Sequence, residues 1–205
     1  MKLYGRRVLS HWHGRGERLP SLSVVNLVAT AELSQTVDLP RLGKIRGFLY
    51  NPAIYRCAYL KDQHTRAKVS IFSTGKMISM GTKSYDDAKH DLKYAAARVS
   101  KLGLARPRDL KLRIRNIVAV SELRHSIQIE SLAEKLPNVI YEPEQFPGAI
   151  YYAKELEGAS ILIFANGKLV LAGLKNEKAI ETAQHVLMQL ARLVSEEPDR
   201  PHLGL

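Results

Sequence analysis

The 205-residue sequence predicts an α+β fold, in which about ten strands form one continuous antiparallel sheet and two long helices cover one of its faces. Three observations lead to this prediction. The sequence repeats itself once, each copy has the pattern of a strand, a short helix, several strands and a long helix, and several strands are apolar at successive positions. Such strands need apolar surroundings on both faces, so we expect the face without helices to be covered as well.

The internal repeat keeps its order along the chain. The segment VVNLVATAELSQTVDLPRL from Val24 matches IRNIVAVSELRHSIQIESL from Ile114 at an offset of 90 residues. YNPAIY from Tyr50 matches YEPEQF from Tyr141 at an offset of 91, and KVSIFSTGKMISMGTK from Lys68 matches SILIFANGKLVLAGLK from Ser160 at an offset of 92. We therefore divide the chain into a basic, flexible N-terminal tail (1–22), a first repeat (23–103), a second repeat (104–195) and a C-terminal tail (196–205).

Local signals define the elements within each repeat. After a first β-branched strand, apolar periodicity predicts short helices at about 39–46 and 129–136. The dipeptides Thr74-Gly75 and Asn166-Gly167 lie between strand-like runs and predict two-residue hairpin turns, because Gly and Asn accept a positive φ at little cost.

A long amphipathic helix closes each repeat. In the first repeat, Ser84 followed by Asp87 is a capping box, and the apolar stripe continues to just before Gly103. In the second, Asn176 is the predicted N-cap, and the stripe runs from Ile180 to Val194.

The positive charge is concentrated in the first half of the chain. The net charge of +11 divides into +4 for residues 1–22, +7 for 23–103 and 0 for 104–205. An excess of this kind favours a polyanionic partner, with nucleic acid ahead of a membrane because no basic amphipathic helix is evident. The alternative is a basic protein without such a partner.

Other classes of protein are disfavoured by what the sequence contains. A lone cysteine cannot build a disulfide framework, and neither an apolar run of 18 residues nor a signal peptide is evident, so we expect a soluble intracellular protein. His11 and His13 lack further metal ligands at suitable spacing, and the TGK sequence lacks the phosphate-loop pattern. No catalytic constellation can be placed, so we expect no enzyme activity, no metal and no cofactor.

The uncovered apolar face of the sheet requires a partner. A second sheet, a tight dimer or a ligand with a broad apolar surface would cover it. Lysines at matched positions of the two repeats, Lys76 with Lys168 and Lys83 with Lys175, favour a polyanion. A duplex minor groove, with sugar walls between two rows of phosphates, satisfies both requirements.

The repeat, its paired asparagines and the IFSTGK and YEPEQFPG segments resemble the conserved core of the TATA-binding protein family, over about residues 24–195. The resemblance implies a pseudo-two-fold saddle of two repeats, with a curved ten-stranded antiparallel sheet and helices on its convex face. It also implies a general transcription initiation factor that binds TATA-like promoter DNA in the minor groove, kinks it with aromatic wedges and nucleates the preinitiation complex.

The resemblance assigns a role to each matched residue. Asn26 and Asn116 become the central pair that donates to minor-groove acceptors, and the groove floor meets Val28, Ile78, Met80, Val118, Val170 and Ala172, where Met80 and Ala172 stand in place of the family's usual Thr. The kinking wedges are Tyr55, Phe72, Phe146 and Phe164. The phosphate-contacting residues are Lys61, Lys76, Lys83, Lys168 and Lys175.

Partners follow in the same way. Glu142, Glu144 and Gln145 match the family's contacts to transcription factor IIB or its archaeal counterpart, and a transcription factor IIA-like factor and a weak homodimer without DNA are further expected partners. We expect a nuclear protein, with the archaeal cytoplasm as the alternative. The alternative function is a related scaffold that binds transcription factors without productive DNA bending.

Overall fold

The computed structural model describes residues 21–104, 110–123 and 125–195, which form one ten-stranded antiparallel sheet and its covering helices. The strands are β1 (Ser23–Glu32), β2 (Phe48–Leu49), β3 (Cys57–Leu60), β4 (Lys68–Phe72), β5 (Lys76–Thr82), β6 (Arg113–Glu122), β7 (Val139–Ile140), β8 (Gly148–Tyr151), β9 (Ser160–Phe164) and β10 (Lys168–Leu174). The helices are α1 (Leu39–Leu42), α2 (Tyr85–Lys101), α3 (Ile129–Lys135), the 3-10 helix η2 (Lys154–Leu156) and α4 (Glu177–Ser195).

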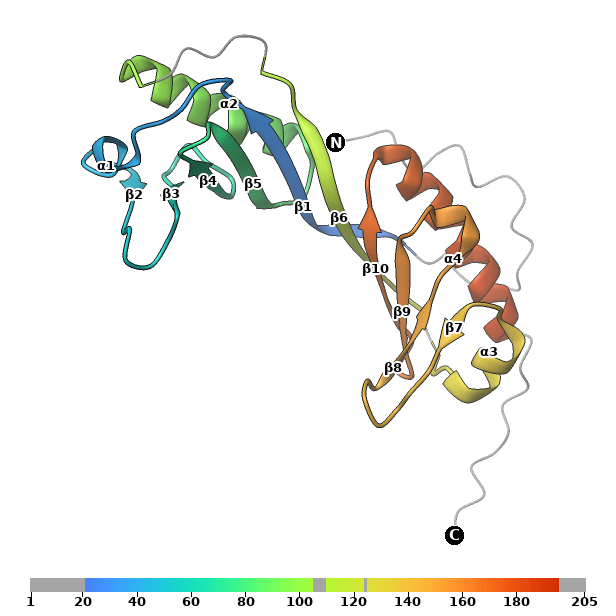
Figure 1. The fold of residues 1–205 in the computed structure, drawn as a ribbon. Coiled ribbons are helices and arrows are strands. Elements are labelled where there is room, and N and C mark those ends of the chain that lie inside the picture. Colours follow the sequence, from blue (N-terminus) through green and yellow to red (C-terminus); the bar gives the residue numbers. More distant parts are fainter. Residues whose placement is uncertain (1–20, 105–109, 124, 196–205) are drawn as a thin grey trace.

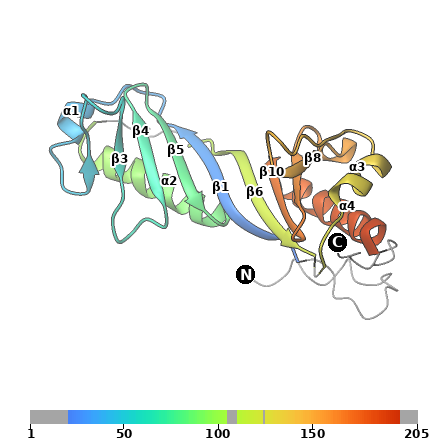
Figure 2. The same ribbon diagram turned by 90° about the horizontal axis from the view of Figure 1, so that it is seen from below.

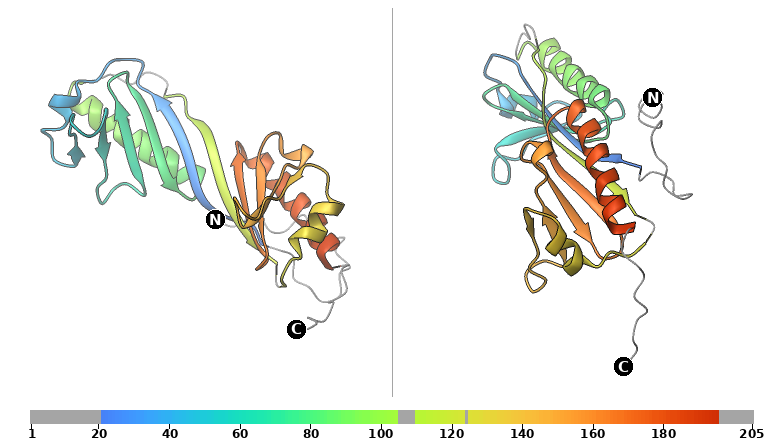
Figure 3. Two further views of the ribbon diagram at one scale, coloured as in Figure 1. Left: turned by 60° about the horizontal axis from the view of Figure 1, so that its bottom comes forward. Right: turned by 90° about the vertical axis from the view of Figure 1, so that its right-hand side faces the viewer.

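The sheet is folded into an arch with the helices on its outside. The strand order β2-β3-β4-β5-β1-β6-β10-β9-β8-β7 is symmetric about the β1–β6 pair. Figure 1 shows the two lobes of the arch on either side of these strands, with α2 and α4 on the outer, convex side. In Figure 2, seen from below, the sheet lies in front of both long helices, and the right panel of Figure 3 shows those helices on one side of the sheet. The predicted α+β saddle is confirmed.

The centre of the arch is nearly symmetric at the level of single residues. In the antiparallel β1–β6 pair, Asn26 is opposite Val118 and Val28 is opposite Asn116. Alternate residues of a strand point to opposite faces, so these four side chains share the face that carries no helix. Residues that are 90 positions apart in the sequence are thus related by a pseudo-two-fold axis between β1 and β6.

The other face of the sheet forms the core. Fully buried residues of the central strands, such as Ala29, Ile117 and Ala119, pack under the long helices. The helices contribute one stripe each, which consists of Ala88, Leu92, Ala95, Ala96 and Val99 in α2 and of Ala183, Val186, Leu187, Leu190, Ala191 and Val194 in α4. Burying a side chain of the size of Leu or Val contributes about 1.5–3 kcal/mol, so these stripes hold the helices to the sheet.

The caps of the long helices are as predicted. Ser84 Oγ accepts a hydrogen bond from the backbone N–H of Asp87 at 3.1 Å and donates to its carboxylate at 2.7 Å, which starts α2. Asn176 Oδ1 accepts from the backbone N–H of Ala179 at 2.7 Å, which starts α4.

The first short helix is shorter than the predicted 39–46. It ends at Leu42, because the following N–H groups of Lys44 and Ile45 bond three residues back rather than four. The second covers Ile129–Lys135, close to the predicted 129–136.

The hairpin turns differ from the predicted two-residue type. Gly75 N–H donates to Phe72 C=O at 2.9 Å and Gly167 N–H to Phe164 C=O at 2.9 Å, so each turn holds three residues and only its glycine has a positive φ. Asn166 instead accepts a hydrogen bond from the backbone N–H of Lys168 at 3.1 Å. A side chain at either glycine would collide with backbone, since its Cβ would lie 2.1 Å from Gln35 O or 2.5 Å from Leu123 O.

Two further predictions concern the tails of the chain and the absence of a membrane-spanning helix or a metal site. The tails at 1–22 and 196–205, with His11 and His13, lie almost entirely outside them. Within the described ranges, no helix is long and apolar enough to cross a bilayer, and no group of three or more His, Cys, Asp or Glu side chains is arranged to hold a metal ion.

Candidate nucleic-acid interface

The concave face of the sheet gathers the side chains predicted to meet DNA. Register places Val28 opposite both Met80 and Asn116, and Val170 opposite Val120. The predicted floor residues Val28, Ile78, Val118, Val170 and Ala172 are only partly buried, and Met80 is 47% exposed. An apolar strip in this state is available for a partner, because no element of the described chain covers it.

The two central asparagines are not equivalent. Asn116 Oδ1 accepts a hydrogen bond from the backbone N–H of Gly173 at 3.0 Å, so its amide N–H groups remain to donate. Asn26 Oδ1 is buried and has no hydrogen-bond partner among the described residues. Both asparagines thus carry the amide donors that a minor-groove reader needs, and among the described residues Asn116 Oδ1 has a hydrogen-bond partner whereas Asn26 Oδ1 has none.

The two predicted wedge pairs also differ. In the second repeat, the rings of Phe146 and Phe164 meet edge to face with centroids 5.7 Å apart. Gly148 makes room for this contact, since a Cβ there would lie 3.1 Å from the Phe146 ring and 3.2 Å from the Phe164 ring. The apolar pair therefore depends on a glycine between its two rings.

In the first repeat, the position of Gly148 belongs to Cys57, at an offset of 91 residues, and Cys57 is opposite Phe72 in the sheet. The Tyr55 ring packs edge-on against Tyr59, with centroids 5.0 Å apart. A hydrogen bond with the Cys57 side chain, and to a lesser extent desolvation, raises the pKa of Tyr59. Among the described residues, the ring that Tyr55 meets is thus Tyr59 and not Phe72, its predicted wedge partner.

All five predicted phosphate contacts are exposed lysines at the margins of the concave face. Lys76 and Lys168 start β5 and β10, and Lys83 and Lys175 follow the ends of the same strands, while Lys61 follows β3. In register, Lys76 is opposite Glu32 and Lys168 is opposite Glu122. These two glutamates, which match in the repeat but were assigned no role in the site, reduce the local positive charge at the hairpin end of each repeat.

The segment between β3 and β4, which carries Lys61, is anchored from the convex side by α2. The buried carboxylate of Asp91 accepts from the backbone N–H groups of Arg66 at 2.9 Å and Ala67 at 2.8 Å. Asp62 accepts from the Tyr94 hydroxyl at 2.9 Å and from Arg98 at 3.0 Å. Burial acts to raise the pKa of Asp62, but hydrogen bonds from the His64 backbone N–H and Tyr94, together with the Arg98 charge, lower it below its ordinary value.

The loops at the two ends of the arch carry opposite chemistry. In the second repeat, Glu142, Glu144 and Gln145 are exposed in a turn closed by hydrogen bonds to Glu142 C=O from the N–H groups of Gln145 and Phe146, both at 2.9 Å. The corresponding loop of the first repeat has no acidic residue and exposes Ile54 at 65%, at the position that Gln145 occupies in the second repeat. The two loops therefore present surfaces of different charge.

Lys68 and Tyr59 are two further residues of this face that were not predicted to belong to the site. Lys68 is exposed at the start of β4, and its Nζ lies 4.3 Å from the centroid of the Tyr59 ring. Strand alternation offered a signal, because Lys68, Ser70 and Phe72 share one face. Lys68 was passed over because its repeat partner is Ser160, so it is not one of the matched lysines.

Comparisons with known proteins agree on one family. The family model described as transcription factor TFIID (or TATA-binding protein, TBP) matches residues 21–102 and 111–193. A TATA-box-binding protein of Cenarchaeum symbiosum is 32% identical over 167 residues, which cover 80% of this chain and 91% of the relative. One from Pyrobaculum aerophilum is 36% identical over 176 residues, covering 85% and 88%. The solved structure of Methanococcus jannaschii TBP superimposes with a TM-score of 0.72 at 27% identity, covering 87% of this chain and all of that chain.

Proposed function

Because the chain belongs to the TATA-binding protein family, we propose that it is a DNA-binding transcription initiation factor that seats TATA-like promoter DNA on its concave face. Relatives that bear the name TATA-box-binding protein support the coarse function. The observation that supports the site is the concave face itself, which joins a partly exposed apolar strip to marginal lysines and a pair of contacting phenylalanines.

Minor-groove binding accounts for the chemistry of the strip. A·T pairs present only acceptors in the minor groove, which suits the amide donors of Asn116 and Asn26. Guanine adds an amino group there, and the apolar floor side chains, such as Val28 and Val118, would leave that donor without a partner. Met80 and Ala172 have no hydroxyl to donate, so the chain reads base edges with fewer polar groups than a threonine pair would supply.

Bending is the second part of the proposal. Kinking by inserted apolar side chains is a property of this family, and we transfer it to Phe146, Phe164, Phe72 and Tyr55 of this chain. Bending costs on the order of 1–10 kcal/mol, which the additional contacts of a wrapped duplex must offset. The contacting pair Phe146–Phe164 is fully apolar, so it suits insertion between bases better than Tyr55, whose hydroxyl needs a polar partner.

The proposed factor then recruits the transcription machinery. The exposed carboxylates of Glu142 and Glu144 suit the basic surface of a transcription factor IIB-like protein, which would nucleate the preinitiation complex. The loop of the first repeat, without acidic groups, would take a different factor. The Cenarchaeum and Pyrobaculum relatives are archaeal, which supports the archaeal cytoplasm over the nucleus as the place of action.

Fluorescence energy transfer across a short duplex labelled at both ends tests this function. On a TATA duplex, we expect the wild type to shorten the end-to-end distance and Phe146→Ala plus Phe164→Ala to abolish the shortening, while a guanine-rich duplex stays unaffected. Binding that leaves the distance unchanged, or a double variant that bends like wild type, would instead favour the scaffold without productive bending.

A further inference from the structure

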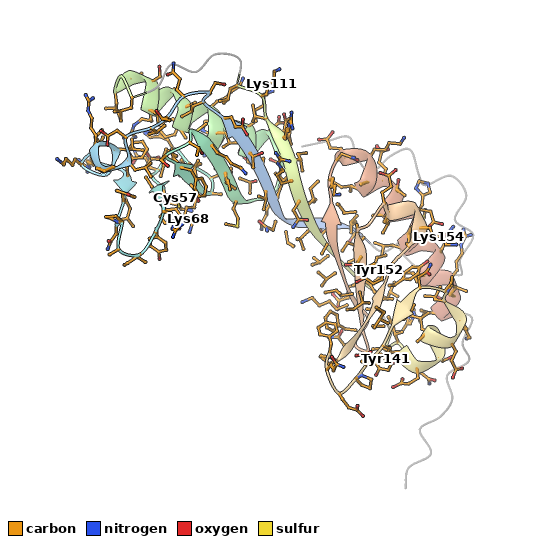
Figure 4. All side chains as sticks on the ribbon, in the orientation of Figure 1. Cys57, Lys68, Lys111, Tyr141, Tyr152 and Lys154 are labelled. Atoms are coloured by element: carbon orange, nitrogen blue, oxygen red, sulfur yellow. The ribbon has the colours of Figure 1, made fainter. Side chains whose placement is uncertain are left out.

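A lysine and two tyrosines form a stacked group on the concave face of the first repeat. Lys68 Nζ lies 4.3 Å from the Tyr59 ring centroid, and Tyr59 meets the edge of Tyr55 at 5.0 Å with an interplanar angle of 81°. The start of β4 and the β3 segment with its preceding loop thus place a cation, a ring and a predicted wedge in series. Figure 4 shows Lys68 beside Cys57 on the side of the sheet turned away from α2.

Register confirms that this group faces the proposed DNA site. Tyr59 is opposite Ser70 and Lys68 is opposite Met80, whose side chain is 47% exposed on the same face. Val69, the next residue after Lys68, is fully buried toward the helices. Since alternate residues point to opposite faces, Lys68 points to the concave side.

The second repeat lacks this group. At the repeat offsets of 91 and 92 residues, Tyr59 corresponds to Ile150 and Lys68 to Ser160, neither of which carries a charge or a ring. Ser160 is opposite Ala172 in the sheet, where Lys68 is opposite Met80. The two repeats therefore pair their strands in the same way here and differ only in the side chains at these positions.

Lys68 is available for an anion. Within the described part of the chain it is exposed and forms no ion pair, while Tyr59 restricts where its ammonium group can lie. A cation over an aromatic ring at an exposed site gains only about 0.5–1 kcal/mol, so the contact orients the lysine without neutralising it.

We propose that Lys68 is a phosphate-binding residue of the first repeat, positioned by Tyr59, with no counterpart in the second repeat. The inference rests on the proposed DNA-binding function. It adds one backbone phosphate to the contacts at this end of the duplex and makes the two halves of the interface unequal in charge.

The salt dependence of DNA affinity tests whether Lys68 contacts a phosphate. Each phosphate contact contributes about 0.9 to the slope of log K against log salt, so removing one contact lowers the fall in affinity between 50 and 200 mM salt by about 3.5-fold. We expect Lys68→Gln to reduce the slope by this amount on a TATA duplex. Lys93→Gln, which removes an exposed lysine from α2 on the convex side, should leave it unchanged, and Lys68→Arg should keep it.

Three further outcomes distinguish the phosphate contact of Lys68, the positioning role of Tyr59 and the proposed DNA-binding function. A Lys68→Gln slope equal to that of wild type would overturn the proposal, and Lys68→Ser, which installs the residue of the second repeat, repeats the test if the Gln variant folds poorly. Tyr59→Ile should retain the slope but weaken binding about twofold to fivefold, and an unchanged affinity would remove the positioning role of Tyr59. If wild type itself shows no salt-dependent DNA binding, the proposed function fails rather than the role of Lys68.

Discussion

Asn116→Asp separates the binding role of the central asparagine from its role in the fold. The substitution keeps the shape of the side chain and the Oδ1 acceptor, so the 3.0 Å hydrogen bond from Gly173 N–H survives. We therefore expect the free energy of unfolding to change by less than about 0.5 kcal/mol, as for ordinary surface substitutions.

DNA binding should respond far more strongly. The variant exchanges the amide donors for an anionic acceptor that faces the acceptors of an A·T-rich groove. Leaving a buried hydrogen-bonding group without its partner costs about 1–3 kcal/mol, and repulsion from the phosphates adds to this loss. A total of about 3 kcal/mol corresponds to roughly a hundredfold weaker binding.

Fluorescence anisotropy of a labelled TATA duplex at fixed salt measures this loss, and urea unfolding checks the fold. Asn176→Asp is the matched control, because it makes the same chemical change at the cap of α4 on the convex side, where its Oδ1 also accepts a backbone N–H. We expect the control to bind within about twofold of wild type, since aspartate is also a good N-cap. A loss below fivefold for Asn116→Asp would show that the central amide does not donate to DNA.

Three predictions concern residues that support the proposed interface. In Gly148→Ala the new Cβ would lie 2.8 Å from Ile163 O, so we expect urea unfolding to show a loss of about 1–3 kcal/mol, and an unchanged midpoint would refute the crowding argument. Asp91→Ala removes the acceptor of two backbone N–H groups and should cost about 3 kcal/mol by the same assay, with a loss below about 1 kcal/mol contradicting it. The lowered pKa of Asp62 means that its stabilising contribution is present above the ordinary value of 3.8 and disappears as the pH falls through the folded-state pKa. Asp62→Asn should therefore flatten the acid limb of stability against pH, and an unchanged limb would show that Asp62 does not contribute to it.

Features set by neighbouring residues were predictable from the sequence. The caps at Ser84 and Asn176 act within three residues, and the repeat placed both long helices and the strands around them. The limits of such reasoning appear in the hairpins, where Gly75 and Gly167 were identified but the turn geometry was not. A glycine at the last turn position fits both the two-residue type I′ turn and the three-residue turn, so the dipeptide alone could not separate them.

The site was less accessible to sequence reasoning because its differences depend on pairing across strands. The placement of Cys57 opposite Phe72 and of Gly148 opposite Phe164 follows from the register of β3 with β4 and of β8 with β9, which neither segment specifies alone. Lys68 meets Tyr59 only after β3 and β4 are paired. Lys68 is matched by Ser160 in the second repeat, so the pattern that the two repeats share does not reveal it.

The difference between the two repeats favours one orientation of the protein on the duplex in the proposed complex. A symmetric saddle would bind a duplex equally well in two orientations, because its halves are related by a two-fold axis. Here the first half carries the additional Lys68 and a net excess of positive charge, whereas the second carries the Phe146–Phe164 pair and the acidic loop at Glu142. A stiff A-tract has a narrow groove with a strong negative potential, which suits the more cationic half, and a flexible TA step unstacks at lower cost, which suits the apolar pair. Both preferences favour the same orientation on a site with an A-tract at one end and TA steps at the other, so a factor that docks on the acidic loop would be placed at a defined end of the promoter.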